Sequence, residues 1–347
     1  MKFDFSGSHN EWDPLEEVIL GTTTNAQIPQ LKRDQLAIEY PELIGKEVMP
    51  NKVFPQHILE ETEEDLLALS KLLTSLGIKV RRPEDINFKE KIKTPDWETD
   101  GFYNYCPRDS MLVVGDKIIE APMTLRSRLF DQYAYKKLLV EYLNEGANWL
   151  SAPKPRLLDE TYSFENKDKA LNNLEPIFDA ANILRAGRDL FYLISNTGNE
   201  LGAKWLQRIL GNEYKVHVCR DVYNGIHIDS TISLLRPGLV LLNPERVNMS
   251  NIPEPLKSWD KIWCPEMLDN NVYDTPPLSS KWIGMNLLML SPKLALVDKK
   301  QIPLIKELKK NGIEALDFNL RNSRILGGGF HCVTLDTKRK GSLENYF

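Results

Sequence analysis

The stretch Ser110-Met111-Leu112-Val113-Val114-Gly115-Asp116-Lys117-Ile118-Ile119 sets two apolar runs on either side of a Gly-Asp pair. Apolar runs of this length around a turn signal predict a β-hairpin. Similar patterns farther along the chain predict hairpins at 182–194, 228–242 and 285–297. A fifth begins at 330–335, and we expect an N-terminal strand at 17–20 to complete it.

Between the hairpins lies a second recurring unit, a helix followed by a short strand. Apolar residues at helical spacing predict helices at 66–76, 133–142, 201–210 and 304–310. They lead into short strands at 77–80, 146–150, 214–218 and 312–316, and a weaker copy ends at 259–263. The copies are about 45 to 70 residues apart, which is typical of repeat and propeller architectures. The pattern favours a repeated α/β fold over the alternative, a generic α/β domain of unrelated elements.

The composition is that of an ordinary globular protein, with 347 residues, 42% hydrophobic and 27% charged. No linker divides the chain, so we expect a single domain over 1–347, with the polar stretch 153–169 as a surface excursion. The net charge of −5 argues against a nucleic-acid partner, because phosphate binding needs a concentrated positive patch. No run reaches the roughly 18 apolar residues of a membrane-spanning helix, so no membrane partner is expected.

The four cysteines are scattered and form no Cys-x-x-Cys pair: Cys106, Cys219, Cys264 and Cys332. Neither a zinc ribbon nor a disulfide framework is expected. Free thiols suit a reducing compartment, and residues 1–5 lack the apolar stretch of a secretory signal, so we expect a cytoplasmic protein. No metal site is expected, because the histidines do not cluster with cysteine or acid at ligand spacing.

Residues with useful chemistry stand at the starts of four predicted hairpins: Asp109, Asp179, His227, Asp229 and Cys332. If the hairpins start near one axis, these side chains converge. Each aspartate taken alone fits a turn or cap role better than a catalytic one. The convergence is therefore the observation on which a functional prediction depends.

Cys332 ends the sequence Gly327-Gly328-Gly329-Phe330-His331-Cys332. Three glycines allow close approach of backbone and ligand, so this cysteine could be reactive; the alternative is a buried structural thiol. On a strand, His331 should point away from Cys332, which predicts a structural role for that histidine. The other three cysteines lack acid and histidine neighbours and are expected to be inert.

His227 titrates near neutrality and therefore suits general acid–base work. Asp179 could orient its imidazole and stabilise the cationic form. Asp229, two residues along a predicted strand, should share a face with His227. Two carboxylates near a thiolate would suit a planar, cationic guanidinium, which carboxylates bind through charge-assisted hydrogen bonds.

Taken together, several segments resemble the glycine amidinotransferase family. They stand in the family's order at nearly its spacing, from about Asn10 to Tyr346, and are Glu120-Ala121-Pro122-Met123, Arg126-Ser127-Arg128, Glu175-Pro176-Ile177-Phe178-Asp179-Ala180-Ala181, Arg185-Ala186-Gly187-Arg188-Asp189, His227-Ile228-Asp229, Asn243-Pro244-Glu245-Arg246, Ser279-Ser280-Lys281-Trp282 and Gly327 to Cys332. Each segment alone is modest, but jointly they are highly specific.

The resemblance implies a pentein fold, a five-bladed pseudosymmetric α/β propeller of ββαβ modules with the site at its centre. It implies an amidinotransferase that moves the amidino group of L-arginine to an amine acceptor and releases ornithine. The reaction would pass through a covalent amidino-cysteine and need no cofactor. The family also suggests a homodimer.

The family's functional residues fall on matching positions of this chain. Its catalytic residues fall on Cys332, His227 and Asp179, and its guanidino-binding acids on Asp109 and Asp229. Its carboxylate-binding residues fall on Arg246 and Ser280, with Ser279 adjacent. The loop that contains Asn224 and Ile226 would shape the acceptor pocket.

Some positions depart from the family's pattern. Ile226 stands where the glycine-using enzymes carry methionine, Asn182 replaces a second acid, and Val333 replaces an aromatic residue. The acceptor therefore stays open among glycine, lysine and a secondary-metabolite amine. Two alternatives also stay open: a hydrolase of the same fold, similar to arginine deiminase, and a non-catalytic pentein that serves as a binding factor.

Overall fold

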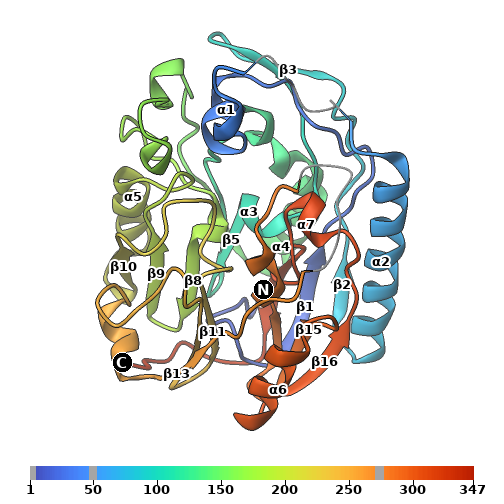
Figure 1. Ribbon diagram of the computed structural model, residues 1–347, viewed down its shortest axis with the longest axis vertical. Helices are drawn as coiled ribbons and strands as arrows, with labels where there is room; N and C mark the ends of the chain where they lie inside the picture. Colours follow the sequence, from blue (N-terminus) through green and yellow to red (C-terminus); the bar gives the residue numbers. More distant parts are fainter. Residues whose placement is uncertain (1–4, 47–52, 270–276) are drawn as a thin grey trace.

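The structure is a computed structural model that describes residues 5–46, 53–269 and 277–347. Residues 1–4, most of the N-terminal stretch considered above, lie outside the described residues. Figure 1 shows the strands inside and the helices α2 (Gln56–Ser75), α5 (Glu200–Leu210) and α6 (Ile302–Lys310) at the periphery. The fold is of the predicted α/β class.

The described residues form five three-stranded sheets that share one topology. In each sheet the first two strands pair antiparallel, and the third strand pairs parallel with the second. Four of them are β5 (Met111–Val114), β6 (Lys117–Glu120) and β7 (Asn148–Ser151); β8 (Ile183–Ala186), β9 (Asp189–Leu193) and β10 (Lys215–Cys219); β11 (Ile232–Arg236), β12 (Leu239–Leu242) and β13 (Asp260–Trp263); and β14 (Leu288–Ser291), β15 (Leu294–Asp298) and β16 (Glu314–Phe318).

The fifth sheet joins segments from opposite ends of the chain. β17 (Thr334–Arg339) pairs antiparallel with β1 (Leu15–Leu20), and β1 pairs parallel with β2 (Lys79–Arg81). This pairing confirms the predicted fifth hairpin.

A helical segment precedes the third strand of every sheet. It is α4 (Lys136–Glu145), α5, the short 3-10 helix η8 (Glu254–Ser258), α6 and α2, in the order in which the sheets were introduced. The weaker copy of the repeat thus keeps its strand and shortens its helix.

The helix α5 illustrates how the sequence produces this unit. Asn199 caps its N-terminus, where its side chain accepts a hydrogen bond from the backbone N–H of Gly202 at 2.9 Å. Ala203, Leu206 and Leu210 recur at helical spacing and are buried in one hydrophobic cluster with residues of β9. The apolar face therefore holds the helix against its own sheet.

Two first strands begin four residues later than predicted. β11 begins at Ile232 instead of 228, and β17 begins at Thr334 instead of 330. The backbone N–H of Ile228 donates to Ala181 O of η6 (Ala180–Asn182), and that of Val333 donates to Gly329 O within its own turn, so neither group is available to a strand ladder. His227, Asp229 and Cys332 consequently lie in turns ahead of the strands.

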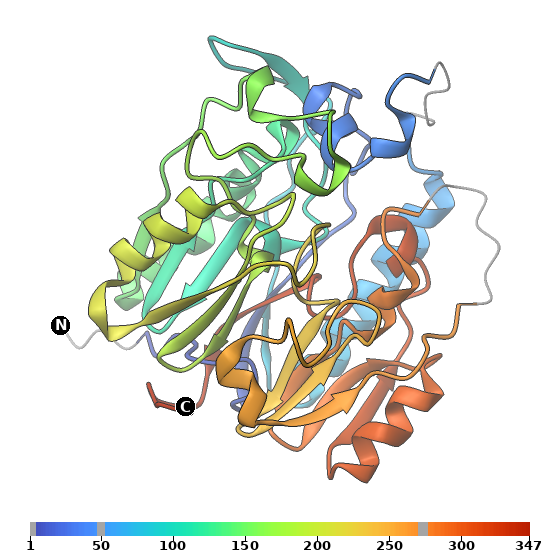
Figure 2. The same cartoon turned by 60° about the vertical axis from the view of Figure 1, so that its left-hand side comes forward.

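The stretch 153–169 is more than the expected surface excursion. Leu157 and Tyr162 are buried, and the Tyr162 hydroxyl donates to Thr124 O at 2.8 Å. Together with α1 (Arg33–Ile38) and a two-stranded sheet of β3 (Lys91–Lys93) and β4 (Glu98–Asp100), it lies at one end of the molecule (Figure 2). Among the described ranges, no helix is long and apolar enough to cross a membrane.

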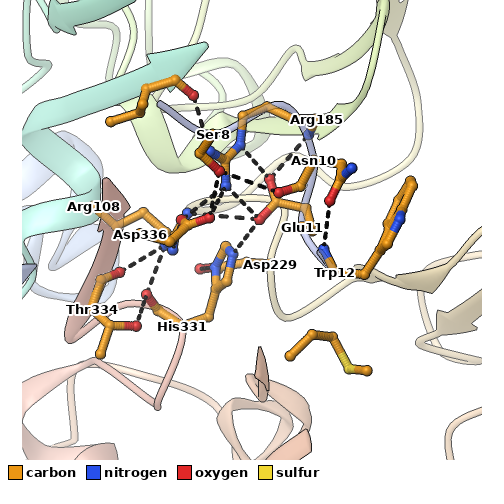
Figure 3. A network of polar contacts seen from close by, with 12 residues as sticks. Ser8, Asn10, Glu11, Trp12, Arg108, Arg185, Asp229, His331, Thr334 and Asp336 are labelled. Atoms are coloured by element: carbon orange, nitrogen blue, oxygen red, sulfur yellow. Dashed lines mark hydrogen bonds and ion pairs between the residues drawn. The ribbon is translucent and has the colours of Figure 1, made fainter. Parts of the chain in front are cut away.

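A buried network of charged side chains links several sheets (Figure 3). Arg185 of β8 donates to Glu11 at 2.9 Å and to Asp336 of β17 at 2.8 Å, and Arg108 donates to Asp336 at 2.6 Å. Removing one partner of such a pair leaves an uncompensated buried charge, which is strongly destabilising. The network therefore ties β8, β17 and the segment ahead of β1 to one another.

We predict unequal stability losses for two glycine substitutions. Gly7 and Gly238 both have positive φ, +65° and +77°, but a Cβ on Gly7 would lie 1.6 Å from the carbonyl oxygen of Gly115, whereas one on Gly238 would meet no atom of the described residues within 4 Å. G238A should lower the free energy of unfolding by roughly 1–2 kcal/mol, the cost of a left-handed non-glycine residue. G7A should cost more, because the N-terminal segment must move off the β5–β6 turn. Urea unfolding of both variants measures the difference, and equal losses would contradict the prediction.

Candidate active site

The five residues predicted at the hairpin starts all lie directly ahead of the first strand of a sheet. Asp109 lies in α3 (Pro107–Ser110), Asp179 immediately precedes η6 (Ala180–Asn182), His227 and Asp229 lie in turns before β11, and Cys332 lies in a turn before β17. All five are buried.

His227 lies between two carboxylates. Its Nε2 is 3.1 Å from Asp179 Oδ2, and its Nδ1 is 3.5 Å from Asp109 Oδ1. Burial alone would lower the pKa of His227, but the negative charges of Asp109, Asp179 and Asp229 raise it to about 9. His227 is therefore in its cationic, imidazolium form at neutral pH.

The backbone at His227 is in the left-handed region, with φ of +59°. This conformation is uncommon for a residue with a Cβ and is found mostly where the surroundings enforce it. Here the backbone N–H of His227 donates to Thr197 Oγ1 at 3.4 Å. Because the residue lies in a turn, the predicted strand geometry that put His227 and Asp229 on one face was wrong.

Asp179 is fixed from its other side. Its Oδ1 accepts a hydrogen bond from the backbone N–H of Thr124 at 2.8 Å, which leaves Oδ2 for the imidazole of His227. Met123, directly before Thr124, has a φ of +56°. Thr124, which directly follows the amidinotransferase-like segment 120–123, thus orients Asp179.

Asp109 shares its charge with an arginine that sequence reasoning missed as a partner. Arg128 Nη1 donates to Asp109 Oδ2 at 2.6 Å and Arg128 Nε donates to Asp131 Oδ2 at 2.8 Å. The buried Asp109 Oδ1 has no hydrogen-bond partner among the described residues. One oxygen of Asp109 thus remains for a cationic ligand. The motif Arg126-Ser127-Arg128 was the only signal in the sequence.

The thiol of Cys332 contacts a carboxylate and not the imidazole. Its Sγ donates to Asp229 Oδ2 at 3.3 Å, and within the described part of the chain no hydrogen bond links it to His227. Asn286 holds the turn, since its Oδ1 accepts from the backbone N–H groups of His331 and Cys332 at 2.9 and 3.1 Å. Sequence reasoning did not find Asn286, because nothing nearby marks it.

The prediction that His331 points away from Cys332 was wrong. Its Nδ1 is 2.9 Å from Asp229 Oδ2, the same oxygen that accepts the Cys332 thiol. The two neighbours can reach one oxygen because 331–333 form a turn and not a strand. Burial alone would raise the pKa of Asp229, but the hydrogen bond and charge of His331, helped by the charge of His227, lower it to about 2.

Cys106 is also closer to the site than expected. A Cβ on Gly328 would lie 2.6 Å from Cys106 Sγ and 3.3 Å from Cys332 Cβ, so both cysteines pack against this glycine. The hydrogen bond with Cys106, burial and the charge of Asp229 raise the pKa of Cys332 well above its ordinary value. The prediction that Cys106 has no acidic company was wrong, since burial raises its pKa and the charge of Asp109, three residues along the chain, adds to the rise. The cysteines Cys219 and Cys264 are buried without an acid that affects them.

A cavity of about 600 Å³ gathers the remaining predicted residues. It is lined by Asn224, Ile226, Arg246, Ser279 and Ser280, among others. Ser230 and Gly327, which flank the turns of Asp229 and of Cys332, line it too. The cavity therefore reaches the segments that bear the thiol and the carboxylate.

Arg246 is held in the cavity wall by neutral groups. Its Nη1 donates to Ser230 O, Ser230 Oγ and Thr231 Oγ1 at 2.9 to 3.0 Å, its Nη2 donates to Ser280 Oγ at 3.1 Å, and its guanidinium stacks over Tyr223 at 3.7 Å. It forms no ion pair with a described residue, and burial lowers its pKa. A cation without a counter-ion in a cavity wall suits an anionic ligand group.

Glu39 lines the same cavity and was missed by sequence reasoning. Its carboxyl group makes no hydrogen bond or ion pair with any described residue. Burial raises the pKa of Glu39 to about 7, the charges of Arg128 and His227 oppose the rise, and those of Asp179 and Asp109 add to it. It follows α1, and no motif marks it.

These features define a class of site: a buried thiol and an imidazole lie among carboxylates, next to a cavity whose wall carries the guanidinium of Arg246. Among the described residues, no group of three or more histidine, cysteine or acidic side chains is placed to hold a metal ion. No protein-family model matches the chain.

Comparison with known proteins gives the family. An inosamine-phosphate amidinotransferase of Streptomyces glaucescens is 54% identical over 340 residues, which cover 97% of this chain and 98% of that protein. The mitochondrial glycine amidinotransferase of Gallus gallus is 39% identical over 359 residues, covering 98% of this chain and 84% of that protein. The chain belongs to the amidinotransferase family and is a transferase.

Solved structures agree. The inosamine-phosphate amidinotransferase of Streptomyces griseus matches with a TM-score of 0.96 at 53% identity, over 99% of both chains. SxtG of Microseira wollei, an amidinotransferase in the saxitoxin biosynthetic pathway, matches with a TM-score of 0.90 at 38% identity, again over 99% of both chains. The resemblance noted from the sequence is confirmed.

We predict that Glu39→Gln changes how stability depends on pH. The folded-state pKa of Glu39, about 7, lies above its ordinary value of 4.5. Between these values the folded chain holds a proton that the unfolded chain has lost, so stability from this group falls as pH rises toward 7. E39Q removes this term, so its Tm relative to wild type should rise between pH 5 and pH 8. E42Q, which changes an exposed glutamate on the same cavity wall, is the matched control; a parallel rise in E42Q would contradict the assignment.

Proposed function

We propose that the chain transfers the amidino group of L-arginine to an amine acceptor by way of a covalent amidino-Cys332, releasing ornithine. The observation that carries the proposal is a buried thiol bonded to Asp229, together with an imidazole that lies between Asp109 and Asp179 and whose charge also acts on Asp229. The identity of 54% with an amidinotransferase over nearly the whole chain supports the same reaction class.

Arginine fits the site by charge. Its guanidinium would lie between Asp229 and Oδ1 of Asp109, which accepts no hydrogen bond from a described residue, and its α-carboxylate would reach the guanidinium of Arg246. Ser279 and Ser280 would line the same end of the substrate, since Ser280 Oγ already accepts from Arg246. Carboxylates and arginine bind these two ends through charge-assisted hydrogen bonds.

Before arginine binds, both the thiol and the imidazole carry a proton, because the pKa values of Cys332 and His227 are both raised. A bound guanidinium adds positive charge beside them and favours the loss of one proton. The pair is then a thiolate and an imidazolium. The thiolate attacks the guanidino carbon, and the carbon–nitrogen bond to the ornithine side chain breaks as His227 gives its proton to that nitrogen.

The second half-reaction runs in the opposite sense. After ornithine leaves, the acceptor amine enters and attacks the amidino carbon of the Cys332 adduct, while the neutral His227 takes the proton of that amine. The carbon–sulfur bond breaks, and the product leaves with the thiolate and imidazolium restored. Asp179 would stabilise the imidazolium in both halves.

The acceptor that we propose is an amine of secondary metabolism. The relatives at 54% and 38% identity are named for inosamine phosphates and for the saxitoxin pathway. Ile226 lines the cavity, as expected for a residue that shapes the acceptor pocket.

The arrangement of the whole chain is also part of the proposal. We propose that the five sheets are the blades of one pentein propeller, formed by a single domain over 1–347. Contacts between strands of different sheets support it, since β17 contacts β5, β8 contacts β11, and β14 contacts β1 of the fifth sheet. We further propose a homodimer in the cytoplasm, where its buried free thiols would stay reduced.

The experiment that tests the function uses arginine labelled in the guanidino carbon. The chain is incubated with this arginine and a panel of amines that includes an inosamine phosphate, glycine, lysine and putrescine, and the products are weighed by mass spectrometry. Ornithine with a labelled, acceptor-dependent guanidino product supports transfer. Citrulline with ammonia would support the hydrolase alternative, and unchanged arginine with every amine would support the binding-factor alternative.

Cys332→Ala should remove the covalent intermediate. Wild-type protein incubated with labelled arginine alone should gain the mass of one amidino group on the peptide that contains Cys332, whereas C332A should gain none. Turnover should fall by at least about 10³-fold, as for other enzymes that lose their nucleophile. The matched variant C106A should retain the adduct; an adduct that persists in C332A would refute the nucleophile.

Arg246→Gln should weaken the recognition of arginine and not of agmatine, which lacks the α-carboxylate. One charge-assisted hydrogen-bonded pair contributes about 1.5–3 kcal/mol, so kcat/KM for arginine should fall by roughly 10- to 100-fold. The value for agmatine should stay near that of the wild type. Equal losses for both substrates would contradict the role of Arg246.

A further inference from the structure

His331 connects Asp229, which accepts the hydrogen bond of the Cys332 thiol, to Glu11 of the buried charged network. Its Nδ1 is 2.9 Å from Asp229 Oδ2, and its Nε2 is 3.2 Å from Glu11 Oε2 (Figure 3). Its ring is buried. The imidazole thus bridges a carboxylate of the site and one of the buried charged network.

Hydrogen-bond donors decide the charge of this bridge. An ionised carboxylate only accepts hydrogen bonds, and a neutral imidazole has a single N–H to give. The pKa of Asp229 is about 2, and that of Glu11 is also lowered, since the effect of burial is outweighed by Arg185 and His331. With both acids ionised, each ring nitrogen of His331 can hydrogen-bond to its carboxylate only through an N–H group, so the two contacts together call for an N–H on both nitrogens.

A cation in this place has a consequence for Asp229. Oδ2 of Asp229 is held by the imidazolium and the Cys332 thiol together. The thiol contact must end when the thiolate forms, but the contact with His331 can stay. The carboxylate then keeps its charge and its direction throughout the reaction.

We propose that His331 is a positioning residue of the transferase reaction: by donating to Asp229 from a ring anchored on Glu11, it keeps Asp229 ionised and aimed at the substrate guanidinium. Glu11 is in turn fixed by two hydrogen bonds from Arg185 at 2.9 Å. This inference rests on the proposed role of Asp229 in binding arginine.

Other charged and titratable groups also act on Asp229, and the test must hold them constant. His227 and His331 both favour the ionised form of Asp229. The charge of Asp229 in turn affects the pKa values of Cys332, Cys106 and Arg246. Glu11, Arg185 and Asp336 lie beyond His331, and Arg108 donates to the backbone O of His331 at 2.7 Å. Only variants at position 331 remove the bridge and leave all of these in place.

Two substitutions separate the two ends of the bridge. In His331→Asn the new side chain is too short to reach Glu11, but its amide nitrogen can take the place of Nδ1 and donate to Asp229. His331→Gln instead places its amide near the position of Nε2, so it can donate to Glu11 and not to Asp229. Both changes remove the positive charge and leave a polar side chain of similar size.

The measurement is arginine binding between pH 5.5 and pH 7.5, by calorimetry, in C332A, C332A/H331N and C332A/H331Q. The alanine at 332 stops the chemistry and removes the thiol's own titration. In C332A the Kd should be governed by an ionised Asp229 over the whole range. In C332A/H331Q the Kd should weaken severalfold more on going to pH 5.5, because Asp229 becomes protonated, and C332A/H331N should lie closer to C332A.

The outcomes separate three conclusions. If C332A/H331Q shows the pH dependence of C332A, or if both double variants lose affinity equally at every pH, the positioning role is overturned. If C332A itself binds no arginine at pH 7.5, the proposed function is overturned together with it. Should the variants fail to fold, NMR of wild-type protein labelled with ¹⁵N-histidine decides: protons on both ring nitrogens of His331 at pH 7.5 support the proposal, and a neutral ring overturns it.

Discussion

The structure depends on one buried arginine. Arg185 holds Glu11 on one side and Asp336 on the other, and these three residues come from β8, the N-terminal segment and β17. Because none of the three charges is exposed to water, each needs the other two in place. The same network fixes the position of the turns from which the site is built, since Glu11 contacts His331 and Arg108 of the network precedes Asp109. The architecture and the site therefore share a single set of contacts.

The site combines a high density of acids with few cations of its own. Asp109, Asp179 and Asp229 surround His227, while Arg128 and His331 offset part of the negative charge. The surrounding acids raise the pKa values of both the thiol and the imidazole. In the proposed reaction a guanidinium would be both the group to be transferred and the charge that favours the thiolate. Its opposite end would meet Arg246, which is held by hydroxyl and carbonyl oxygens and forms no ion pair with a described residue.

Much of the fold could be predicted because hairpins and amphipathic helices leave local patterns. The pairing of β1 with β17 was predicted from such patterns, although the paired residues Val18 and Asp336 are far apart in sequence. The starts of β11 and β17 could not be predicted, since the N–H of Ile228 donates to Ala181 of η6 and that of Val333 to its own turn, and neither donates to a ladder. Because the predicted strand starts were four residues too early, the predicted side-chain directions of His331 and Asp229 were also wrong. Arg128, Glu39 and Asn286 act only through partners that are remote in sequence, and no local pattern announces them.

The union of β17 with β1 also sets an order of events during synthesis. β1 can pair with β2 early, because α2 and β2 follow it within the first quarter of the chain. Its other edge must wait for a strand that leaves the ribosome about 300 residues later, and contacts of such large sequence separation form slowly. The turn that carries Cys332 directly precedes that strand. A nascent chain therefore lacks Cys332, the nucleophile that we propose, until this last sheet forms, so catalytic competence would come at the end of folding.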